Sequence, residues 1–476
     1  MGQEIESAEF NPADFEKFQS QLLDEMSLLR ELFSQDSFIS SHPVGGHELE
    51  AWLVDQSTQP APINQEFLNR LSNPLVVQEL SRFNVELNSI PRKLSGKAMG
   101  LMQADLSALW NSCQQTAATL NARLVMMGTL PVLDDSQLTM DNMSEVERYR
   151  GLNEQVFRLR EGEPIRLDIT GIDHLQSTHQ DVMLEAAATS FQLHLQVRPE
   201  NAVRYYNASV LGSAPLLAAS ANSPFLFGKN LWAETRIPLF EQAVNTNIEG
   251  EVGHTGKSRV TFGHGWCRES VLELFEENIA LYPALLPTVR DTDRKSLWHL
   301  RLHNGTIWRW NRPLIGIDKD GYHLRIEQRV VPAGPTIVDM IANAAFYYGI
   351  TSALANSQQV PESKIDFDQV KNDFYVVARY GLTASICWPG EGEVMIKDLL
   401  LEKLIPEARA GLSELSLSEK EVSFYLDVFE ARVQSGQNGT AWQRSYLRYH
   451  DCSVREMTET YIKNQQSSKP VHEWLI

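Results

Sequence analysis

The segment Gly46–Asp55, GHELEAWLVD, is typical of a β-strand, and its Glu48 and Glu50 indicate what kind of sheet to expect. Residues two apart on a strand point to the same face, so both carboxylates lie on one side. Two acidic side chains on one strand face repel each other unless something binds between them. The segment therefore predicts a strand whose polar face holds a ligand.

Four further segments show the same division into a polar and an apolar face. The polar residues are Glu86 and Asn88 in Val85–Asn88, Gln192, His194 and Gln196 in Phe191–Val197, His299, Arg301 and His303 in Trp298–His303, and Arg325, Glu327 and Arg329 in Leu324–Val330. Each strand taken alone also fits the solvent-facing side of an antiparallel sheet. Together these faces contain no lysine, and a face crowded with carboxylates and arginines is unstable without ligands. Divalent cations and phosphates would satisfy both signs of charge.

The carboxylates of these faces, with one histidine, form a candidate metal site. Its expected ligands are Glu48, Glu50, Glu86, His194 and Glu327. Oxygen-rich sites with at most one imidazole suit Mg²⁺ or Mn²⁺ better than Zn²⁺. A histidine flanked by apolar residues is also common in protein cores, so a structural role is the alternative for the imidazole. Arginines on the same face can hold phosphate or carboxylate oxygens through paired hydrogen bonds, and these are Arg301, Arg325 and Arg329.

The rest of the chain predicts an α+β protein with a mainly antiparallel sheet and a helical C-terminal third. Helices are expected at 12–36, 100–124, 200–219, 337–348 and 418–434, and further strands at 124–128, 297–310 and 322–331 with a turn at 318–321. Strands and helices are interleaved without a regular βαβ rhythm, which argues against a doubly wound fold. No P-loop, GxGxxG, HExxH or GxSxG motif is present, which removes the commonest nucleotide, zinc-protease and esterase classes.

The composition is that of a globular protein of 476 residues, with 43% hydrophobic and 22% charged residues. Its 42 Lys and Arg against 61 Asp and Glu leave a formal charge of −19, which argues against nucleic acid as a partner. The cysteines, Cys113, Cys267, Cys387 and Cys452, form no CxxC pair and are expected to be buried structural thiols. No signal peptide is visible, and the longest apolar stretch is too short to span a membrane. We therefore expect a cytoplasmic protein without a membrane partner, and a homodimer as the default oligomer.

In the order of its motifs, the chain resembles the type 2 glutamate–cysteine ligases and their carboxylate–amine ligase relatives in the glutamine-synthetase-like superfamily. The matching pieces are GHELEAWLVD (46–55), FNVELNSIP (83–91), FQLHLQV (191–197), SANSPF (220–225), RIEQRVVPAG (325–334), ARYGL (378–382) and GTAWQR (439–444). The resemblance implies a curved antiparallel sheet forming a funnel, with helices outside and ATP and Mg²⁺ within. We expect one catalytic domain at 41–450, a helical segment at 1–40 and a C-terminal tail at 451–476.

The resemblance also implies roles for particular residues. Glu48, His194 and Glu327 would bind the metal that bridges the ATP phosphates, and Glu50 and Glu86 a metal nearer the acceptor substrate. Arg329 would contact the transferred phosphate, and Arg236 is a candidate for binding a substrate carboxylate. From the residues themselves, Arg301 is a second candidate catalytic residue, and Arg150 and Asn88 are further candidate substrate-binding residues. For Arg150, an ordinary charged helix surface is the alternative. The segment between Gly305 and Arg325 is longer than the resemblance predicts. Its Trp308, Arg309, Trp310 and Arg312 would reshape the pocket, which puts glutamate and cysteine as substrates in doubt.

The reaction implied is the ATP-dependent joining of a small carboxylate to a small amine, amino acids among them, through an acyl phosphate. A metal-dependent hydrolase using the same carboxylates and a metal-bound water is one alternative. A catalytically silent protein of the same fold that binds a nucleotide or metabolite is another. Turnover of ATP that depends on an amine acceptor discriminates among the three.

Overall fold

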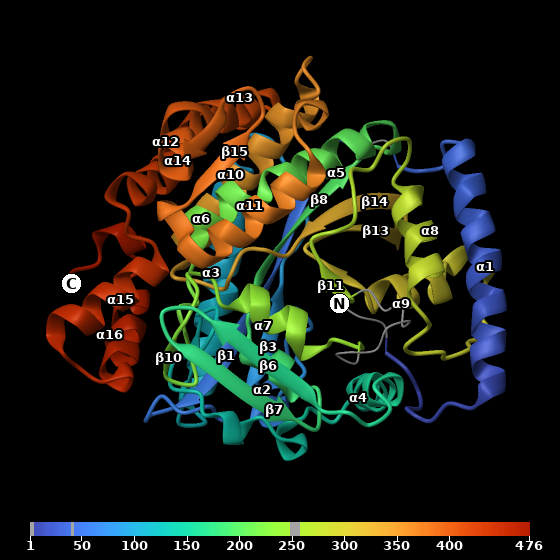
Figure 1. Ribbon diagram of the computed structural model, residues 1–476, viewed down its shortest axis with the longest axis horizontal. Coiled ribbons are helices and arrows are strands. Elements are labelled where there is room, and N and C mark those ends of the chain that lie inside the picture. The colour runs from blue at the N-terminus through green and yellow to red at the C-terminus, as the bar shows by residue number, and fades with distance from the viewer. Residues whose placement is uncertain (1–3, 40–41, 248–257) are drawn as a thin grey trace.

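The computed structural model of the protein describes residues 4–39, 42–247 and 258–476. Within these residues an eight-stranded sheet is built around the long strand β1 (Val44–Asp55). The strand order is β13 (Asn311–Asp318), β14 (Gly321–Gln328), β8 (Phe191–Val197), β1, β3 (Asn84–Asn88) and β2 (Val76–Gln78), with β4 (Arg92–Lys93) and β5 (Ala122–Val125) also paired to β1. Its strand pairs are antiparallel, and the sheet is strongly curled (Figure 1). The α+β prediction with a curved antiparallel sheet is confirmed.

Alternation along each strand separates the two faces of this sheet. Leu49 of β1, Leu193 of β8 and Ile326 of β14 are fully buried in the main hydrophobic core. Their neighbours in sequence, such as Glu48 and Glu327, point to the opposite face, where the sheet lines a pocket. Burial of one apolar face therefore fixes the register that brings the polar side chains of different strands together.

Helices cover the apolar face of the sheet. Those that contact its strands are α3 (Ala98–Ala118), α5 (Ala202–Leu211) and α10 (Ile337–Asn356), and α6 (Ser213–Ser220), α13 (Ile405–Glu414) and α14 (Glu419–Ser435) pack against these helices. Of the described helices, α10 alone is long and apolar enough to cross a membrane, and most of it is buried inside the fold. The Tyr348 hydroxyl of α10 donates to the carbonyl oxygens of Gly46 (3.0 Å) and His194 (3.3 Å), which ties the helix to β1 and β8.

Smaller elements surround this framework. The helices are α1 (Pro12–Ser34), α2 (Asn64–Leu71), α4 (Glu147–Leu159), α7 (Arg236–Ala243), α8 (Leu272–Leu281), α9 (Trp298–Gly305), α11 (Phe367–Tyr380), α12 (Ile396–Leu399), α15 (Gly439–His450) and α16 (Val454–Gln466). The strand pairs are β6 (Ile165–Thr170) with β7 (His174–His179), β9 (Phe225–Leu226) with β10 (Lys229–Asn230), β11 (Val260–Thr261) with β12 (Trp308–Arg309), and β15 (Ser385–Trp388) with β16 (Gly392–Met395).

Helix α1 lies on one flank of the molecule beside α8 and α9, and α15 and α16 lie on the opposite flank (Figure 1). The segment 451–476, expected as a tail, contains α16, and the Gln465 side chain is hydrogen-bonded to the carbonyl oxygens of Met126 (2.8 Å) and Pro335 (2.6 Å). Residues 40 and 41, where the expected boundary of the catalytic domain falls, lie outside the described residues.

Two sequence predictions of secondary structure are wrong. The expected helix at 200–219 is two helices, α5 and α6, which meet at Gly212. The expected strand at 297–310 begins with helix α9 instead, and only Trp308–Arg309 pairs as a strand. His299 and His303, four residues apart, share a buried face of α9 and bond with Glu25 and the Asn278 carbonyl. These contacts with α1 and α8 override the period-two pattern of Leu300 and Leu302.

Candidate active site

Three neighbouring strands bring Glu48, His194 and Glu327 together. His194 of β8 is paired in register with Glu327 of β14, and Glu48 lies on the adjacent strand β1. His194 Nε2 is 3.2 Å from Glu48 Oε1, and one ligand atom from each of the three residues lies within 4.8 Å of the others. The described residues contain no second group of three such side chains. The structure thus brings together the three residues expected to share one metal ion.

The donor atoms of this cluster fit Mg²⁺ or Mn²⁺. Two carboxylates and one imidazole form the oxygen-rich set that these ions accept. The His194 side chain is buried, its Nε2 faces the Glu48 carboxylate at 3.2 Å, and its Nδ1 forms no hydrogen bond within the described part of the chain. Leaving a buried polar group without a hydrogen bond is costly. A cation beside the imidazole would account for the arrangement.

Two arginines hold the Glu327 carboxylate. Arg312 of β13 forms two hydrogen bonds with it, from Nε at 2.9 Å and from Nη2 at 3.1 Å, and Arg329 Nη1 adds a third at 3.1 Å. Burial alone would raise the pKa of Glu327, but Arg312 and then Arg329 lower it to about 2. The carboxylate is therefore ionised at neutral pH, and it can bind a cation while it fixes the two guanidinium groups.

A second group of carboxylates forms an acidic wall of the pocket, which we define as Glu50, Glu79, Glu86 and Glu185. Glu50 and Glu86 face each other in register on β1 and β3. Glu50 is oriented by hydrogen bonds from the Ser190 amide (2.7 Å), the Ser190 hydroxyl (2.8 Å) and the Gln192 amide group (2.9 Å).

Burial and mutual repulsion act on the acidic wall. Burial and the nearby Glu86 hold the pKa of Glu79 well above its usual range, and burial and Glu50 raise the pKa of Glu185 to about 7. The pKa of Glu86 is raised by burial and by Glu48. Such a wall is most stable with a cation or an ammonium group against it.

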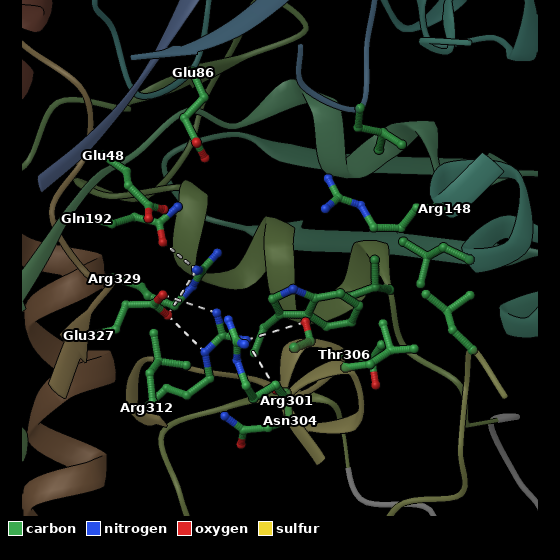
Figure 2. A pocket seen from close by; sticks show the side chains of 18 of the residues that line it. Glu48, Glu86, Arg148, Gln192, Arg301, Asn304, Thr306, Arg312, Glu327 and Arg329 are labelled. Carbon is green, nitrogen blue, oxygen red and sulfur yellow. Dashed lines mark hydrogen bonds and ion pairs between the residues drawn. The ribbon is translucent and has the colours of Figure 1, made fainter. Parts of the chain in front are cut away.

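The pocket encloses about 1340 Å³, including space open to solvent, and Figure 2 shows how its charged side chains are arranged. Glu48, Glu86 and Gln192 lie on one side, and Arg148 of α4 lies across the cavity. Glu327, Arg329 and Arg312 lie below Glu48, with Arg301 next to Arg312. Apolar side chains complete the lining: Leu80, Leu152, Phe240, Val244, Phe275, Leu286, Leu300, Leu302, Trp308, Leu314 and Ile315.

Three predicted substrate-binding residues do not line this pocket. Arg236 is buried in an ion pair with Glu234 (Nε to Oε1, 3.1 Å) and donates to the Val330 carbonyl at 2.7 Å. Arg150 is exposed and pairs with Glu147 of the same helix. Asn88 donates to Glu86 Oε1 at 2.8 Å. Arg236 and Asn88 thus hold residues of the site from outside the pocket. Their direct contact with substrate stays a prediction.

Several pocket residues were not assigned to the site from the sequence. Glu79 and Glu185 lie outside the five strands singled out for polar faces, and Arg148 is two residues from the predicted Arg150, on the side of α4 that faces the cavity. Helical phase could have favoured Arg148, because the nearby Leu152 of α4 also lines the pocket. No comparable signal marks the two glutamates, since the chain contacts the pocket there through loops and short turns.

The long segment after Gly305 enters the pocket as expected, but only in part. Trp308 and Arg312 line the cavity. Trp310 is turned away and donates to Glu241 (2.9 Å), and Arg309 pairs with Glu277 (3.2 Å).

All four cysteines are free thiols, and none of them lines the pocket. Cys113 and Cys267 are buried, as expected, and burial raises the pKa of both thiols to about 12. Cys387 and Cys452 are only partly buried.

The fold and the family together define an ATP-dependent ligase that forms carbon–nitrogen bonds. The chain belongs to glutamate–cysteine ligase family 2, whose sequence model matches residues 44–468. No curated protein sequence matches the chain.

Solved structures with the same fold include the glutamate–cysteine ligase of Francisella tularensis in complex with AMP, with a TM-score of 0.54 and 13% identity over 92% of this chain and 90% of that one. They also include a bifunctional glutathione synthetase from Pasteurella multocida, with a TM-score of 0.51 and 11% identity over 93% of this chain and 54% of that one. At such low sequence identity, the structural matches show the shared fold alone. The ligase class comes from the family match.

Proposed function

We propose that the protein joins a small carboxylic acid to a small amine through an acyl phosphate, with ATP as the phosphoryl donor. The observation that carries this proposal is the Glu48–His194–Glu327 cluster beside Arg312 and Arg329, at the wall of a pocket with charged and apolar lining. Family membership supports ATP use and amide formation. Neither a metal-dependent hydrolase nor a silent binding protein gains support from the family or the fold.

The cluster would hold Mg²⁺ or Mn²⁺ through Glu48, His194 and Glu327. When bound, the ion neutralises negative charge on the phosphates of ATP. Arg329 is positioned by Glu327 and by a hydrogen bond to Gln192, so its guanidinium is fixed before substrate arrives. A fixed planar donor is suited to stabilise a phosphoryl group during transfer.

The proposed ligation proceeds in two steps. In the first, an oxygen of the substrate carboxylate attacks the γ-phosphorus, the new carbonyl–O–P linkage forms, and the bond to ADP breaks. In the second, the amine nitrogen attacks the acyl carbon, inorganic phosphate leaves with its bonding electrons, and the amine loses a proton. ATP supplies the driving force, and no covalent bond to the enzyme is needed.

The arrangement of charge indicates where the amine binds. The acidic wall attracts an ammonium group and provides carboxylates that can accept its proton. Trp308, Phe240 and Leu286 line the same pocket and favour a substrate with apolar parts. Amino acids are the substrate class we expect for both acid and amine.

A trapping experiment tests the reaction. Purified protein is incubated with ATP, Mg²⁺ and a panel of carboxylic acids, with L-glutamate as one member, and hydroxylamine takes the place of the amine. We expect a hydroxamate and stoichiometric ADP with at least one acid, and an amide when an amine replaces hydroxylamine. Glu327→Gln should lose this activity, whereas Glu163→Gln, an exposed surface change, should retain it.

Two results would contradict the proposal. Hydrolysis of an amide or ester without ATP would favour the metal-dependent hydrolase. Tight ATP binding without product across the whole panel would favour the silent binding protein.

A further inference from the structure

Helix α1 precedes the part of the chain that the family model matches, yet it contacts a helix that lines the pocket. The match begins at residue 44, and α1 spans Pro12–Ser34. α1 packs against α8 and α9 on one flank of the molecule (Figure 1). Its side chains Leu22, Met26 and Leu29 are buried in the main core, so the helix is an integral part of the fold.

Glu25 of α1 is buried against the start of α9. One carboxylate oxygen lies 2.7 Å from His299 Nδ1, and the other accepts a hydrogen bond from the Leu300 amide at 2.7 Å. Glu25 is 1% exposed and His299 is fully buried. The Arg290 amide donates to His299 Nε2 at 3.2 Å, so the ring proton resides on Nδ1 and is donated to Glu25.

These contacts fix the first turn of α9. The Leu300 amide is one of the N–H groups that a helix leaves unpaired at its N-terminus. A carboxylate at this end is also favoured by the helix dipole. Glu25 therefore performs a capping function from a different helix, and it sets both the position and the rotation of α9.

Arg301 follows directly on this turn and extends into the pocket (Figure 2). Its guanidinium forms no hydrogen bond or ion pair with the described residues, although it is only partly exposed. Arg325 of β14 lines the same region, lies 3.3 Å from the His323 ring through its Nη1, and forms no ion pair within the described residues. Burial and the charge of Arg325 lower the pKa of Arg301, and the charge of Glu25 offsets part of this shift.

We propose that Glu25 is a positioning residue for Arg301, and that Arg301 and Arg325 together bind an oxyanion of a substrate. The oxyanion is a phosphate of ATP or a carboxylate of the acid, both of which match paired guanidinium groups. The inference rests on the proposed ligase function for the identity of these ligands. It assigns to the N-terminal helix a part in substrate binding, beyond covering the core.

A double-mutant cycle tests whether Glu25 acts by positioning Arg301 or only stabilises the fold. The variants are Glu25→Ala, Arg301→Ala and the double variant, with Glu16→Ala, exposed on the same helix, as the matched control. Binding of Mg²⁺-ATP is measured by calorimetry, and KM and kcat for the acid are measured in the hydroxamate assay with the acid that gives product.

We expect Arg301→Ala to weaken one of these constants about tenfold or more, the usual effect of losing a charge-assisted hydrogen bond. Glu25→Ala should weaken the same constant several-fold and change kcat less. The double variant should be no weaker than Arg301→Ala alone, because Glu25 acts through Arg301. A change in ATP affinity identifies a phosphate as the oxyanion, and a change in KM for the acid identifies a carboxylate.

The proposal is overturned if the effects of Glu25→Ala and Arg301→Ala multiply in the double variant, or if Glu25→Ala alters neither constant. If Glu25→Ala does not fold, Glu25→Gln takes its place, because the amide oxygen can still accept from Leu300 while the charge is lost. A wild-type protein that binds no ATP and forms no hydroxamate would refute the proposed ligase function. An active wild type with multiplicative effects would refute the positioning role alone.

Discussion

Replacing Glu327 by glutamine tests whether Arg312 and Arg329 are held by an ionised carboxylate at this position. The side chain keeps its shape but loses the charge that Arg312 and Arg329 share. Removing one partner of a buried ion pair leaves an uncompensated charge and typically costs about 3–5 kcal/mol. We therefore expect the metal-free variant to be less stable than the parent by about this amount at pH 8.

The pH dependence of this loss follows from the pKa of Glu327. The folded-state pKa lies below the usual value of 4.5, so the stabilisation is present above pH 4.5 and is lost only as the pH falls toward 2. The difference between Glu327→Gln and the parent should thus be the same at pH 5.5 and pH 8. A change confined to alkaline pH would contradict this assignment.

Glu185→Gln is the same type of substitution, but it should change the free energy of unfolding in the opposite direction. Burial and Glu50 raise the pKa of Glu185 from 4.5 to about 7, so the ionised carboxylate destabilises the folded state by up to about 3 kcal/mol at pH 8. Because the folded-state pKa is raised, stability is full below pH 4.5 and falls as the pH rises through 7. The glutamine variant should be more stable than the parent at pH 8, and the difference should vanish near pH 4.5.

Chemical unfolding in the presence of EDTA, at several pH values, measures both effects, with Glu163→Gln as the control. A Glu327→Gln protein more stable than the parent would show that the carboxylate is not held by the two arginines. A Glu185→Gln protein less stable at pH 8 would refute the repulsion within the acidic wall. Adding Mg²⁺ should stabilise the parent more than Glu327→Gln, since a ligand that binds only the folded state raises its stability.

Three further outcomes are expected. His194→Ala should weaken Mn²⁺ binding at least tenfold, as measured by the electron paramagnetic resonance signal of free Mn²⁺, because the cluster loses one of its three donors. Arg329→Lys keeps the charge but loses the planar fork, so turnover should fall more than tenfold while ATP affinity, measured by calorimetry, stays within a few-fold. Removing residues 451–476 should lower the thermal unfolding midpoint, because the buried hydrogen bonds of Tyr461 and Gln465 are lost.

The sequence was sufficient to predict much of the sheet and the centre of the site. Period-two alternation identified the strands that contain Glu48, Glu86, His194 and Glu327, and the order of motifs indicated the family. This worked because one face of each strand packs in the hydrophobic core and the other lines the pocket, so apolar and polar residues alternate in the sequence. The prediction for His194 and Glu327 needed only that their two strands be neighbours, and they are.

Alternation misled the prediction where a helix, not a sheet, buries the apolar residues. Leu300 and Leu302 alternate with His299 and Arg301 as they would on a strand, but the segment is helix α9. The contacts that decide this come from Glu25, more than 270 positions away in the chain. A short segment whose periodicity is ambiguous takes the structure that its partners stabilise.

By itself, then, the sequence determined which residues share a strand face, because strand periodicity is a local property of the backbone, and the order of its motifs implied the Glu48–His194–Glu327 cluster through the family resemblance. Only the tertiary structure decided which charges meet from distant elements. It paired Arg312 with Glu327, directed Arg148 and Glu185 to the pocket, and enclosed Arg236 in a pair with Glu234 away from it. Ion pairs depend on distances of a few ångströms between groups far apart in sequence, and the folding of the whole chain sets those distances.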